Sequence, residues 1–553
     1  MSLGLGSPGV RGRGSAAYSL SVVGDAAKVR PSDHPSGPGA ATLVAARNET
    51  RAFQTVVGAR AARLSGLRVT VARPLVGPRG RRLGASSLSI YRESYIKLSR
   101  RSDPEGGMGR WPDALIPTVD RYFGERRHAF PVDVPAGKTQ TVWVDVFVPA
   151  GSPVGRYTGA LRVTAAGVSA LVPIRLTVIR FTLPATSSLQ SAFGMDWDTP
   201  CLAAYRNNCI RHERDGWRLK ALYVRAALDD RLTISYPQYQ PINDSGERRY
   251  FERYDLPMLQ GTAPTLLRGA RLTSLQVDSG EFLHGWRREA QRNGFASHAF
   301  LYACDEPNTD PSAWRYCKHQ ISAAHAVWPR LSALITANIR SADRFGARSA
   351  IDWLVPIVNE LDDKPHASSF SGNQRPAYDG FLAQSPRKRL WFYTSCEGDG
   401  CTGDSTTDHY FTGWPGYSID EPASEGLAMG WLAFEYRITG ELYYAVDISL
   451  SHAWTNQYAF GNNGDGNLFY AGNPSVIGGH DPIPIESMRL KLIRDGLQDY
   501  EYLRFLATHG RARRAHEVAR NLFAAMYRTA VSDGRLQSAR AQLQGLVEKI
   551  AES

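Results

Sequence analysis

Two neighbouring carboxylates stand directly after a strongly apolar segment. Asp305 and Glu306 follow the run AFLYAC and precede Pro307, which stops a strand from continuing. Where a strand gives way to a loop, two consecutive side chains can both reach a pocket above it. Carboxylates held this close repel each other, and the repulsion tends to keep one of them protonated. An acid beside an ionised carboxylate is suited to cleaving a glycosidic bond.

The adjacency of the pair favours one form of this chemistry. Ordinary glycosidases place two carboxylates on different strands, roughly 5 to 10 Å apart. An adjacent pair fits substrate assistance, in which a 2-acetamido oxygen of the sugar attacks its own anomeric carbon. Asp305 would then orient the acetamido N–H, and Glu306 would protonate the leaving oxygen and later activate water. Tyr393, at another expected strand end, is a candidate to hold the acetamido carbonyl.

Repeated βα units are expected to position these residues. From residue 185 to 483 apolar strands alternate with helical stretches such as 312–327 and 423–439, which predicts a (β/α)8 TIM-type barrel. The expected strands are 191–197, 297–306, 331–338, 351–359, 389–396 and 441–449. Chemistry in such barrels lies at the C-terminal ends of the strands, which adds Asn338 and Asn359 as candidate substrate-binding residues.

Four further residues are candidates for substrate binding, each with a structural alternative. Trp391 and Trp454 could stack on a sugar, although a Trp in a barrel strand more often belongs to the core. Asp465, in the Gly-rich stretch NNGDGN, could bind sugar hydroxyls or simply form a turn. Asp113, in WPDALIP, could reach the barrel mouth from the preceding domain or make an interdomain contact.

The segments on either side of the barrel have different patterns. After a leader at 1–17, residues 18–184 alternate apolar and polar positions in short runs, as in VWVDVFVP, which predicts an antiparallel β-sandwich. Residues 484–553 are expected to be helices that pack on the barrel. The first of them places Leu490, Ile493 and Leu497 at helical spacing.

Composition excludes several classes of function. The net charge is +12, but the basic residues are scattered and lack the aromatic interleaving of a nucleic-acid site, so no nucleic-acid partner is expected. No apolar run is long enough to span a membrane. The absence of a G-x-S-x-G elbow disfavours a serine hydrolase. We expect a carbohydrate partner, no cofactor and no metal.

The cysteines give a hint about compartment. Cys396 and Cys401 bracket the short stretch EGDG, so a local disulfide is a candidate there. A disulfide would favour an extracellular or periplasmic location, although the first residues lack the apolar region of a signal peptide.

Several stretches resemble the domain of unknown function 4091 and the related glycoside hydrolase family 123. The most specific is RLKLIRDGLQDYEYL at 489–503, followed by LYACDEP at 301–307. The others are ARNETRAFQTVV, WPDALIP, VWVDVFVPAGSPVGRYTG, LWFYTSC and NGDGNLFYAG, spread over most of the chain. The resemblance implies a β-sandwich fused to a (β/α)8 barrel and β-N-acetylgalactosaminidase activity, with Asp305 and Glu306 as the catalytic pair.

The sequence is consistent with three functional hypotheses. The first is a retaining β-N-acetylhexosaminidase that uses Asp305 and Glu306. The second is a glycosidase for a sugar without an acetamido group, in which Glu306 works with a carboxylate elsewhere. The third is a carbohydrate-binding protein without activity that has kept the fold.

Overall fold

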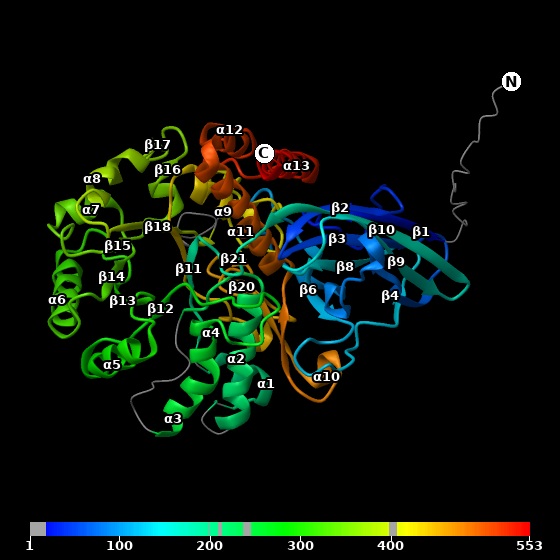
Figure 1. Cartoon of the computed structure of the whole chain (residues 1–553), viewed down its shortest axis with the longest axis horizontal. Coiled ribbons are helices and arrows are strands. Elements are labelled where there is room, and N and C mark those ends of the chain that lie inside the picture. Colours follow the sequence, from blue (N-terminus) through cyan, green and yellow to red (C-terminus); the bar gives the residue numbers. More distant parts are fainter. Residues whose placement is uncertain are drawn as a thin grey trace.

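The computed structural model describes residues 18–196, 198–207, 209, 213–235, 245–396 and 406–552. Within this part of the chain, two five-stranded sheets precede a seven-stranded parallel sheet, so the protein has several domains. The last strand of the first part ends at Thr182 and the first parallel strand begins at Gln190. Figure 1 shows the two parts side by side, with helix α11 between them.

Two packed sheets form the N-terminal sandwich. The first sheet is antiparallel throughout and has the order β1 (Tyr18–Gly24), β3 (Glu49–Ala59), β8 (Thr139–Val148), β5 (Leu88–Leu98) and β6 (Gly109–Pro117). The second has the order β2 (Ala41–Arg47), β10 (Val168–Thr182), β9 (Gly155–Ala165), β4 (Leu64–Val76) and β7 (Val132–Val134). Only the β2–β10 pair among these described strands is parallel, so the predicted antiparallel sandwich holds with one exception.

Strand β8 explains how the sandwich is joined to the rest of the molecule. Val142, Val144 and Val146 lie in the sandwich core, as the alternating pattern predicts. Trp143 and Phe147, whose side chains point to the opposite face of the strand, belong instead to the large core shared with the barrel. Strand β8 is therefore buried on both faces, and the first sheet lies between the second sheet and the barrel.

Seven parallel strands form the barrel sheet within the described residues. Their order is β11 (Gln190–Phe193), β19 (Gly440–Tyr443), β18 (Arg389–Tyr393), β15 (Trp353–Leu354), β14 (Ser332–Ile335), β13 (Ala299–Cys304) and β12 (Leu275–Gln276). All of the pairs are parallel, so the carboxyl ends of the strands share one end of the sheet. Six of these strands coincide with strands expected from the sequence; the two-residue strand β12 was not expected.

Residues 232–235 lie between the two edges of this sheet. The N–H of Phe193 donates to the carbonyl of Thr233 at 2.9 Å, and the N–H of Ser235 donates back to Phe193 at 3.1 Å. On the other side, the N–H of Gln276 donates to Ser235 at 2.8 Å. The sheet is thus nearly closed into a barrel, in which seven strands are formed in the described residues instead of the predicted eight.

Helices of very different length follow the barrel strands. They include α2 (Glu213–Asp229), α5 (Leu283–Asn293), α6 (Pro311–Val327), α7 (Ile339–Arg344), α8 (Asp379–Leu382) and α9 (Glu425–Glu435). The shorter α1 (Thr199–Tyr205), α3 (Ser245–Tyr250) and α4 (Leu256–Gln260) accompany α2. A hairpin of β22 (Phe469–Gly472) and β23 (Ile483–Glu486), with α10 (Pro474–Ile477) in its loop, leads to the C-terminal helices.

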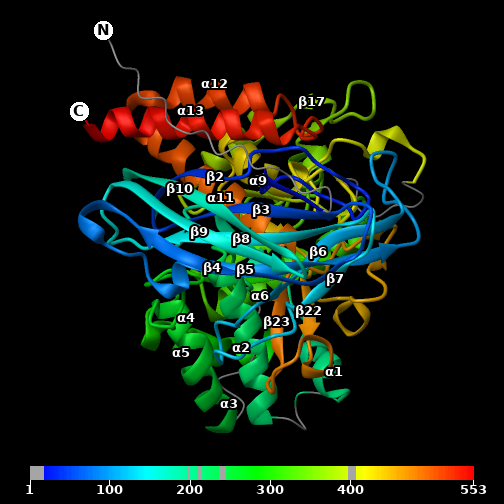
Figure 2. The ribbon, with the colours of Figure 1, turned by 90° about the vertical axis from the view of Figure 1, so that its right-hand side faces the viewer.

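The C-terminal helices are α11 (Met488–Leu506), α12 (Ala512–Leu522) and α13 (Asp533–Glu552). Helix α11 packs against α9 of the barrel on one side and against strands β3 and β6 of the sandwich on the other. Its predicted apolar residues Leu490, Ile493 and Leu497 are buried, but so are Arg489 and Arg494, which flank that apolar face. Figures 1 and 2 show α12 and α13 together near the junction of the two parts.

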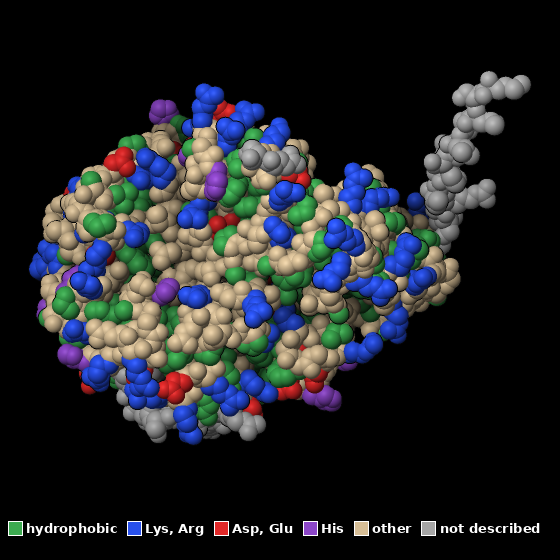
Figure 3. Space-filling model, in the orientation of Figure 1, with side chains coloured by type: hydrophobic (Ala, Val, Ile, Leu, Met, Phe, Trp, Pro, Cys, Tyr) green, Lys and Arg blue, Asp and Glu red, His purple; other side chains and the backbone are tan. Residues whose placement is uncertain are grey.

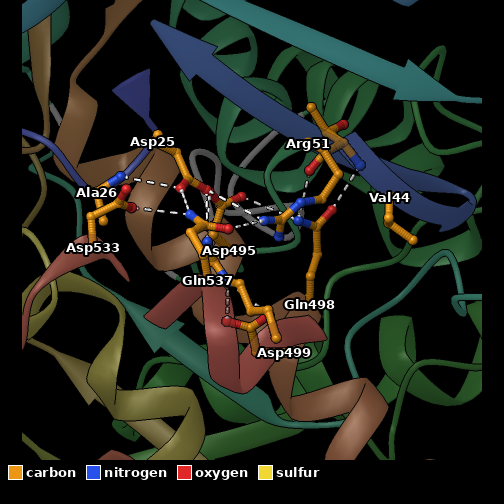
Figure 4. A network of polar contacts seen from close by, with 12 residues as sticks. Asp25, Ala26, Val44, Arg51, Asp495, Gln498, Asp499, Asp533 and Gln537 are labelled. Atoms are coloured by element: carbon orange, nitrogen blue, oxygen red, sulfur yellow. Dashed lines mark hydrogen bonds and ion pairs between the residues drawn. The ribbon is translucent and has the colours of Figure 1, made fainter. Parts of the chain in front are cut away.

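Buried charges connect α11 to the sandwich and to α13. Figure 4 shows Asp25, which follows β1, facing side chains of α11 and α13. Arg540 of α13 lies 2.8 Å from a carboxylate oxygen of Asp25 and 2.9 Å from one of Asp499. Gln498 exchanges two hydrogen bonds of 2.9 Å with the backbone of Thr50 in β3. These contacts fix the C-terminal helices to one another and to the sandwich.

Candidate active site

Asp305 and Glu306 occupy the first two positions after strand β13. Both side chains are exposed, whereas the strand before them and Pro307 after them are largely buried. Glu306 and Asn308 have φ angles of +38° and +45°, so the chain turns sharply here before α6. The disulfide Cys304–Cys317 joins the last residue of β13, which immediately precedes Asp305, to α6. The pair therefore lies at the C-terminal end of the barrel sheet.

Two hydroxyl groups hold the carboxylate of Asp305. Oδ1 accepts a hydrogen bond from the Tyr302 hydroxyl at 2.7 Å and another from the Thr336 hydroxyl at 2.9 Å. Thr336 follows the neighbouring strand β14, and its oxygen also accepts the backbone N–H of Glu306 at 2.8 Å. The burial of Tyr302 and the nearby Asp305 raise the pKa of the Tyr302 phenol, so the phenol stays a donor.

The carboxylate of Glu306 is bound by a residue from a non-adjacent strand. The hydroxyl of Tyr393, the last residue of β18, donates to Oε1 of Glu306. Strands β14 and β15 lie between β13 and β18 in the sheet, so this contact spans part of the barrel end. Burial raises the pKa of Tyr393, and Glu306 raises it further. The phenol is therefore a neutral hydrogen-bond donor to this carboxylate.

A third carboxylate, that of Glu360, lies near this pair. It belongs to the 3₁₀ turn Val358–Glu360 that follows β15, and it accepts a hydrogen bond of 2.6 Å from the amide of Asn338. Burial raises the pKa of Glu360 to about 7; the Asn338 bond lowers it and the charge of Glu306 raises it. Asn338 also caps α7, accepting the N–H of Ser341 at 2.9 Å, so its amide oxygen is already engaged.

Asn359 and Asp465 are held by tyrosine hydroxyls. The amide of Asn359 donates to the hydroxyl of Tyr410 at 3.1 Å. Asp465 is 3% exposed and accepts hydrogen bonds from the hydroxyls of Tyr443 and Tyr444 and from the N–H of Cys396. Burial raises the pKa of Asp465. Asp465 therefore ties the loop after β18 to the end of β19, and its own contact with solvent is small.

One solved structure resembles this chain over nearly its whole length. No family model matches the sequence, and no curated protein is detectably similar to it. A family 123 glycoside hydrolase from Clostridium perfringens superposes on 97% of this chain and 99% of its own, with a TM-score of 0.69 and 13% identity. The chain has the fold of a family 123 glycoside hydrolase.

Two further solved structures, both β-glucuronidases, are much less similar to this chain. β-Glucuronidase 3 of Bacteroides uniformis covers 83% of this chain with 50% of its own length, at 9% identity and a TM-score of 0.23. An FMN-binding β-glucuronidase from a Faecalibacterium prausnitzii strain covers 83% of this chain with 60% of its length, at 10% identity and a TM-score of 0.25. The family 123 fold thus accounts for the sandwich and the barrel together, because its match extends over nearly the whole chain.

Three of the candidate residues are engaged in packing or interdomain contacts. Trp391 is fully buried and stacks on Trp353, with ring centroids 4.7 Å apart. The indole N–H of Trp454 donates to the carbonyl of Ala471 at 2.8 Å, and the residue packs on the apolar cluster between sandwich and barrel. Asp113 is 1% exposed. These placements match the structural alternatives for all three, and we leave the residues out of the proposed site.

The carboxylate of Asp113 forms an interdomain ion pair. Two nitrogens of Arg489 in α11 lie 3.0 and 2.8 Å from its two oxygens, and the hydroxyl of Tyr470 donates to it as well. Because Asp113 belongs to β6 of the sandwich and Arg489 to α11, the contact joins the two parts of the molecule.

The cysteines pair in ways that the sequence left open. Cys201 is bonded to Cys209, and Cys304 to Cys317. The first pair are near neighbours in the sequence, but the second gave no local signal. Cys401 lies outside the described residues, so the predicted Cys396–Cys401 bond stays a prediction.

Three residues that support the carboxylates were not predicted from the sequence. Tyr302, Thr336 and Glu360 each touch or adjoin the pair, and each lies in or just after a strand that was expected. Their position near strand ends was the available signal, because side chains there gather at one end of a parallel barrel. The hydroxyl of Thr336 gave no further hint, since threonines are common in strands.

Elsewhere in the described residues, oxygens of Asp103, Glu105 and Glu421 lie within 4.8 Å of one another and could hold a cation. No helix among the described residues is long and apolar enough to cross a membrane. On the face drawn in Figure 3, Lys and Arg side chains occur over the barrel and the sandwich alike. This distribution agrees with the scattered basic residues of the sequence.

Proposed function

We propose that this protein is a retaining β-N-acetylhexosaminidase, acting on N-acetylgalactosamine by substrate assistance. The observation that carries the proposal is the exposed Asp305–Glu306 pair at the C-terminal end of β13, with each carboxylate held by side chains of other strand ends. The likeness to a family 123 enzyme described as acting in glycolipid glycan hydrolysis supports a carbohydrate substrate. In this proposal residues 232–235 take the place of the eighth barrel strand.

Asp305 orients the acetamido group of the substrate. Both hydroxyl donors bind Oδ1, which leaves Oδ2 to accept the acetamido N–H. This hydrogen bond turns the acetamido carbonyl oxygen toward the anomeric carbon and stabilises the positive charge that develops on the amide as the oxygen attacks. The C1–O bond to the leaving group breaks while the new C1–O bond of an oxazolinium ring forms.

Glu306 serves first as the acid and then as the base. It protonates the leaving oxygen as the glycosidic bond breaks, and the resulting carboxylate then takes a proton from the water that opens the ring. Two displacements at the anomeric carbon retain its configuration. Tyr393, which donates to Glu306 in the absence of substrate, would turn its hydroxyl toward the acetamido carbonyl when the sugar binds.

The position of Glu360 favours a second candidate function. Burial raises the pKa of its carboxylate, and the negative charge of Glu306 raises this pKa further. A glycosidase for a sugar without an acetamido group could use Glu306 as the acid and Glu360 as the second carboxylate. This alternative requires Glu360 for turnover, whereas substrate assistance does not.

Hydrolysis of 4-nitrophenyl β-glycosides of N-acetylgalactosamine, N-acetylglucosamine, galactose and glucose tests the proposal. We expect turnover of N-acetyl sugars alone, with retained configuration by NMR, and a loss of at least about a hundredfold in Glu306→Gln and Asp305→Asn. Glu360→Gln is the matched control and should keep most of the activity. Turnover of galactosides or glucosides that requires Glu360 would favour the second function. Binding without turnover on any glycoside would indicate a protein that only binds carbohydrate.

A further inference from the structure

Three apolar side chains near the C-terminal end of the barrel are open to solvent. Tyr444, Ile448 and Phe460 are 37%, 40% and 55% exposed, and we call them the aromatic platform. The rings of Tyr444 and Phe460 meet edge to face, with centroids 6.0 Å apart and planes at 77°. Ile448 joins them at Gly466, where an added Cβ would lie 2.4 Å from the Tyr444 hydroxyl and 2.9 Å from the Ile448 side chain.

The aromatic platform lies at the end of the barrel that carries the candidate active site. Tyr444 directly follows strand β19, which pairs with β18 so that Tyr393 lies opposite Leu442. Tyr393 is the residue that donates to Glu306. Because all of the barrel strands are parallel, the platform and the catalytic pair are at the same end of the barrel.

Buried polar contacts hold the platform in place. The Tyr444 hydroxyl donates to Asp465 at 3.3 Å, and the same carboxylate accepts the hydroxyl of Tyr443. The N–H of Ile448 donates to the carbonyl of Gly466 at 3.0 Å. A surface that is already ordered loses little conformational freedom when a ligand binds.

The backbone of Phe460 gives an independent indication. Its φ angle is +51°, in the left-handed region that is unfavourable for residues other than Gly, Asn and Asp. The side chain at this strained position is a large apolar ring, and more than half of it faces solvent. Neither the strain nor the exposure stabilises the folded protein, and strain of this kind concentrates at functional sites.

We propose that the aromatic platform binds a second sugar ring of the substrate, next to the residue held by Asp305 and Glu306. The C–H face of a pyranose is apolar and stacks on aromatic rings, while its hydroxyls stay in water. The apolar platform is small and lies at the same end of the barrel as the catalytic pair, which fits one sugar ring better than a protein surface. The inference rests on the proposed function for its substrate class.

Binding to an inactive variant tests the platform without turnover. In the Glu306→Gln background, calorimetric titration with the disaccharide N-acetylgalactosaminyl-β-1,3-galactose is compared with titration of N-acetylgalactosamine. We expect Phe460→Ala to raise the Kd of the disaccharide about fivefold to tenfold and to leave that of the monosaccharide unchanged. Phe460→Trp should restore the affinity. Tyr316→Ala, which removes a ring that is 59% exposed on α6, is the control and should change neither.

Phe460→Gly separates a binding role from a structural one. Glycine adopts the left-handed conformation without strain, so this variant should melt at the same temperature or higher and still bind the disaccharide weakly. Equal disaccharide affinity in the parent and in Phe460→Ala, or no disaccharide binding by the parent, would overturn the platform. If wild-type protein cleaves no aryl glycoside but Phe460→Ala weakens disaccharide binding, the proposed function fails and the platform stands.

Discussion

At the scale of single residues, Thr336 binds both residues of the candidate pair. Its hydroxyl donates to the side chain of Asp305 and accepts the backbone N–H of Glu306. Thr336 is 2% exposed, so water cannot easily replace these bonds. One buried hydroxyl group thus sets the position of both catalytic candidates, without touching the substrate in the proposed mechanism.

Replacing this hydroxyl should lower catalysis more than stability. Thr336→Val keeps the shape of the side chain but removes one of the two hydroxyl donors to Asp305 and leaves the Glu306 N–H without its acceptor. We therefore expect kcat to fall about 10- to 100-fold with little change in KM. Thr336→Ser keeps the hydroxyl and should retain most of the activity. Steady-state kinetics on the 4-nitrophenyl N-acetylgalactosaminide check this. Equal kcat values for the Val and Ser variants would exclude the positioning role.

Glu360 should make the stability of the protein depend on pH. Its pKa is raised from 4.5 to about 7 in the folded state, so the folded protein binds a proton that the unfolded chain has released. The contribution of Glu360 to stability is therefore full below about pH 4.5 and is lost as the pH rises toward 7. Glu360→Gln stays neutral, so its Tm should gain on that of wild type between pH 5 and 8. A constant Tm difference over this range would contradict the shift.

At the scale of elements, the apolar pattern of α11 predicts the helix but does not predict what packs around it. The apolar spacing of Leu490, Ile493 and Leu497 predicts one buried face. The sandwich covers more of the helix surface, so Arg489 and Arg494, which flank this face, are buried too. Their guanidinium groups meet Asp113 and Asp145 at 2.8 and 3.0 Å. The motif RLKLIRDGLQDYEYL, specific as it is, thus supplies interdomain ion pairs.

Removing one partner of such a pair should be costly. Arg489→Met leaves the carboxylate of Asp113 buried without its counter-charge, and we expect a loss of about 3 to 5 kcal/mol in the free energy of unfolding. The double variant Arg489→Met/Asp113→Leu removes both charges and should recover most of that loss. Urea unfolding measures both variants. A double variant as unstable as the single one would show that the charge itself is not the cause.

At the scale of the whole molecule, the sandwich and the barrel share one core. Trp143, Phe147 and Leu115 of the sandwich lie in the same apolar cluster as the barrel strands. Buried ion pairs cross the same junction, among them Arg494 with Asp145. The two parts are therefore joined by contacts of the kind found inside a domain.

This junction predicts a single unfolding transition. If either part unfolded alone, it would expose the apolar core that it shares with the other. Calorimetry and near-UV circular dichroism should therefore report coincident unfolding midpoints for the full chain. Arg494→Met, which breaks a pair across the junction, should lower the midpoint of that one transition. Two resolved transitions, with only one of them shifted in Arg494→Met, would contradict the shared core.

The sequence by itself determined the local elements. Period-two alternation in VWVDVFVP gave β8, and apolar runs gave six of the barrel strands, because such patterns are set by the immediate neighbours of each residue. The apolar run of β13 and the following Pro307 also predicted that Asp305 and Glu306 lie at the end of a strand. The two-residue strand β12 and residues 232–235 were missed, since segments so short carry no periodic signal.

Only the tertiary structure decided which distant side chains meet. The contacts of Tyr393 with Glu306 and of Thr336 with Asp305 exist because the parallel barrel sheet brings separate strand ends together. The same sheet places Trp391 beside Trp353, and docking of the sandwich buries Asp113 beside Arg489. No local pattern encodes these pairings, because each joins segments that are far apart in the chain and adjacent only in the folded barrel.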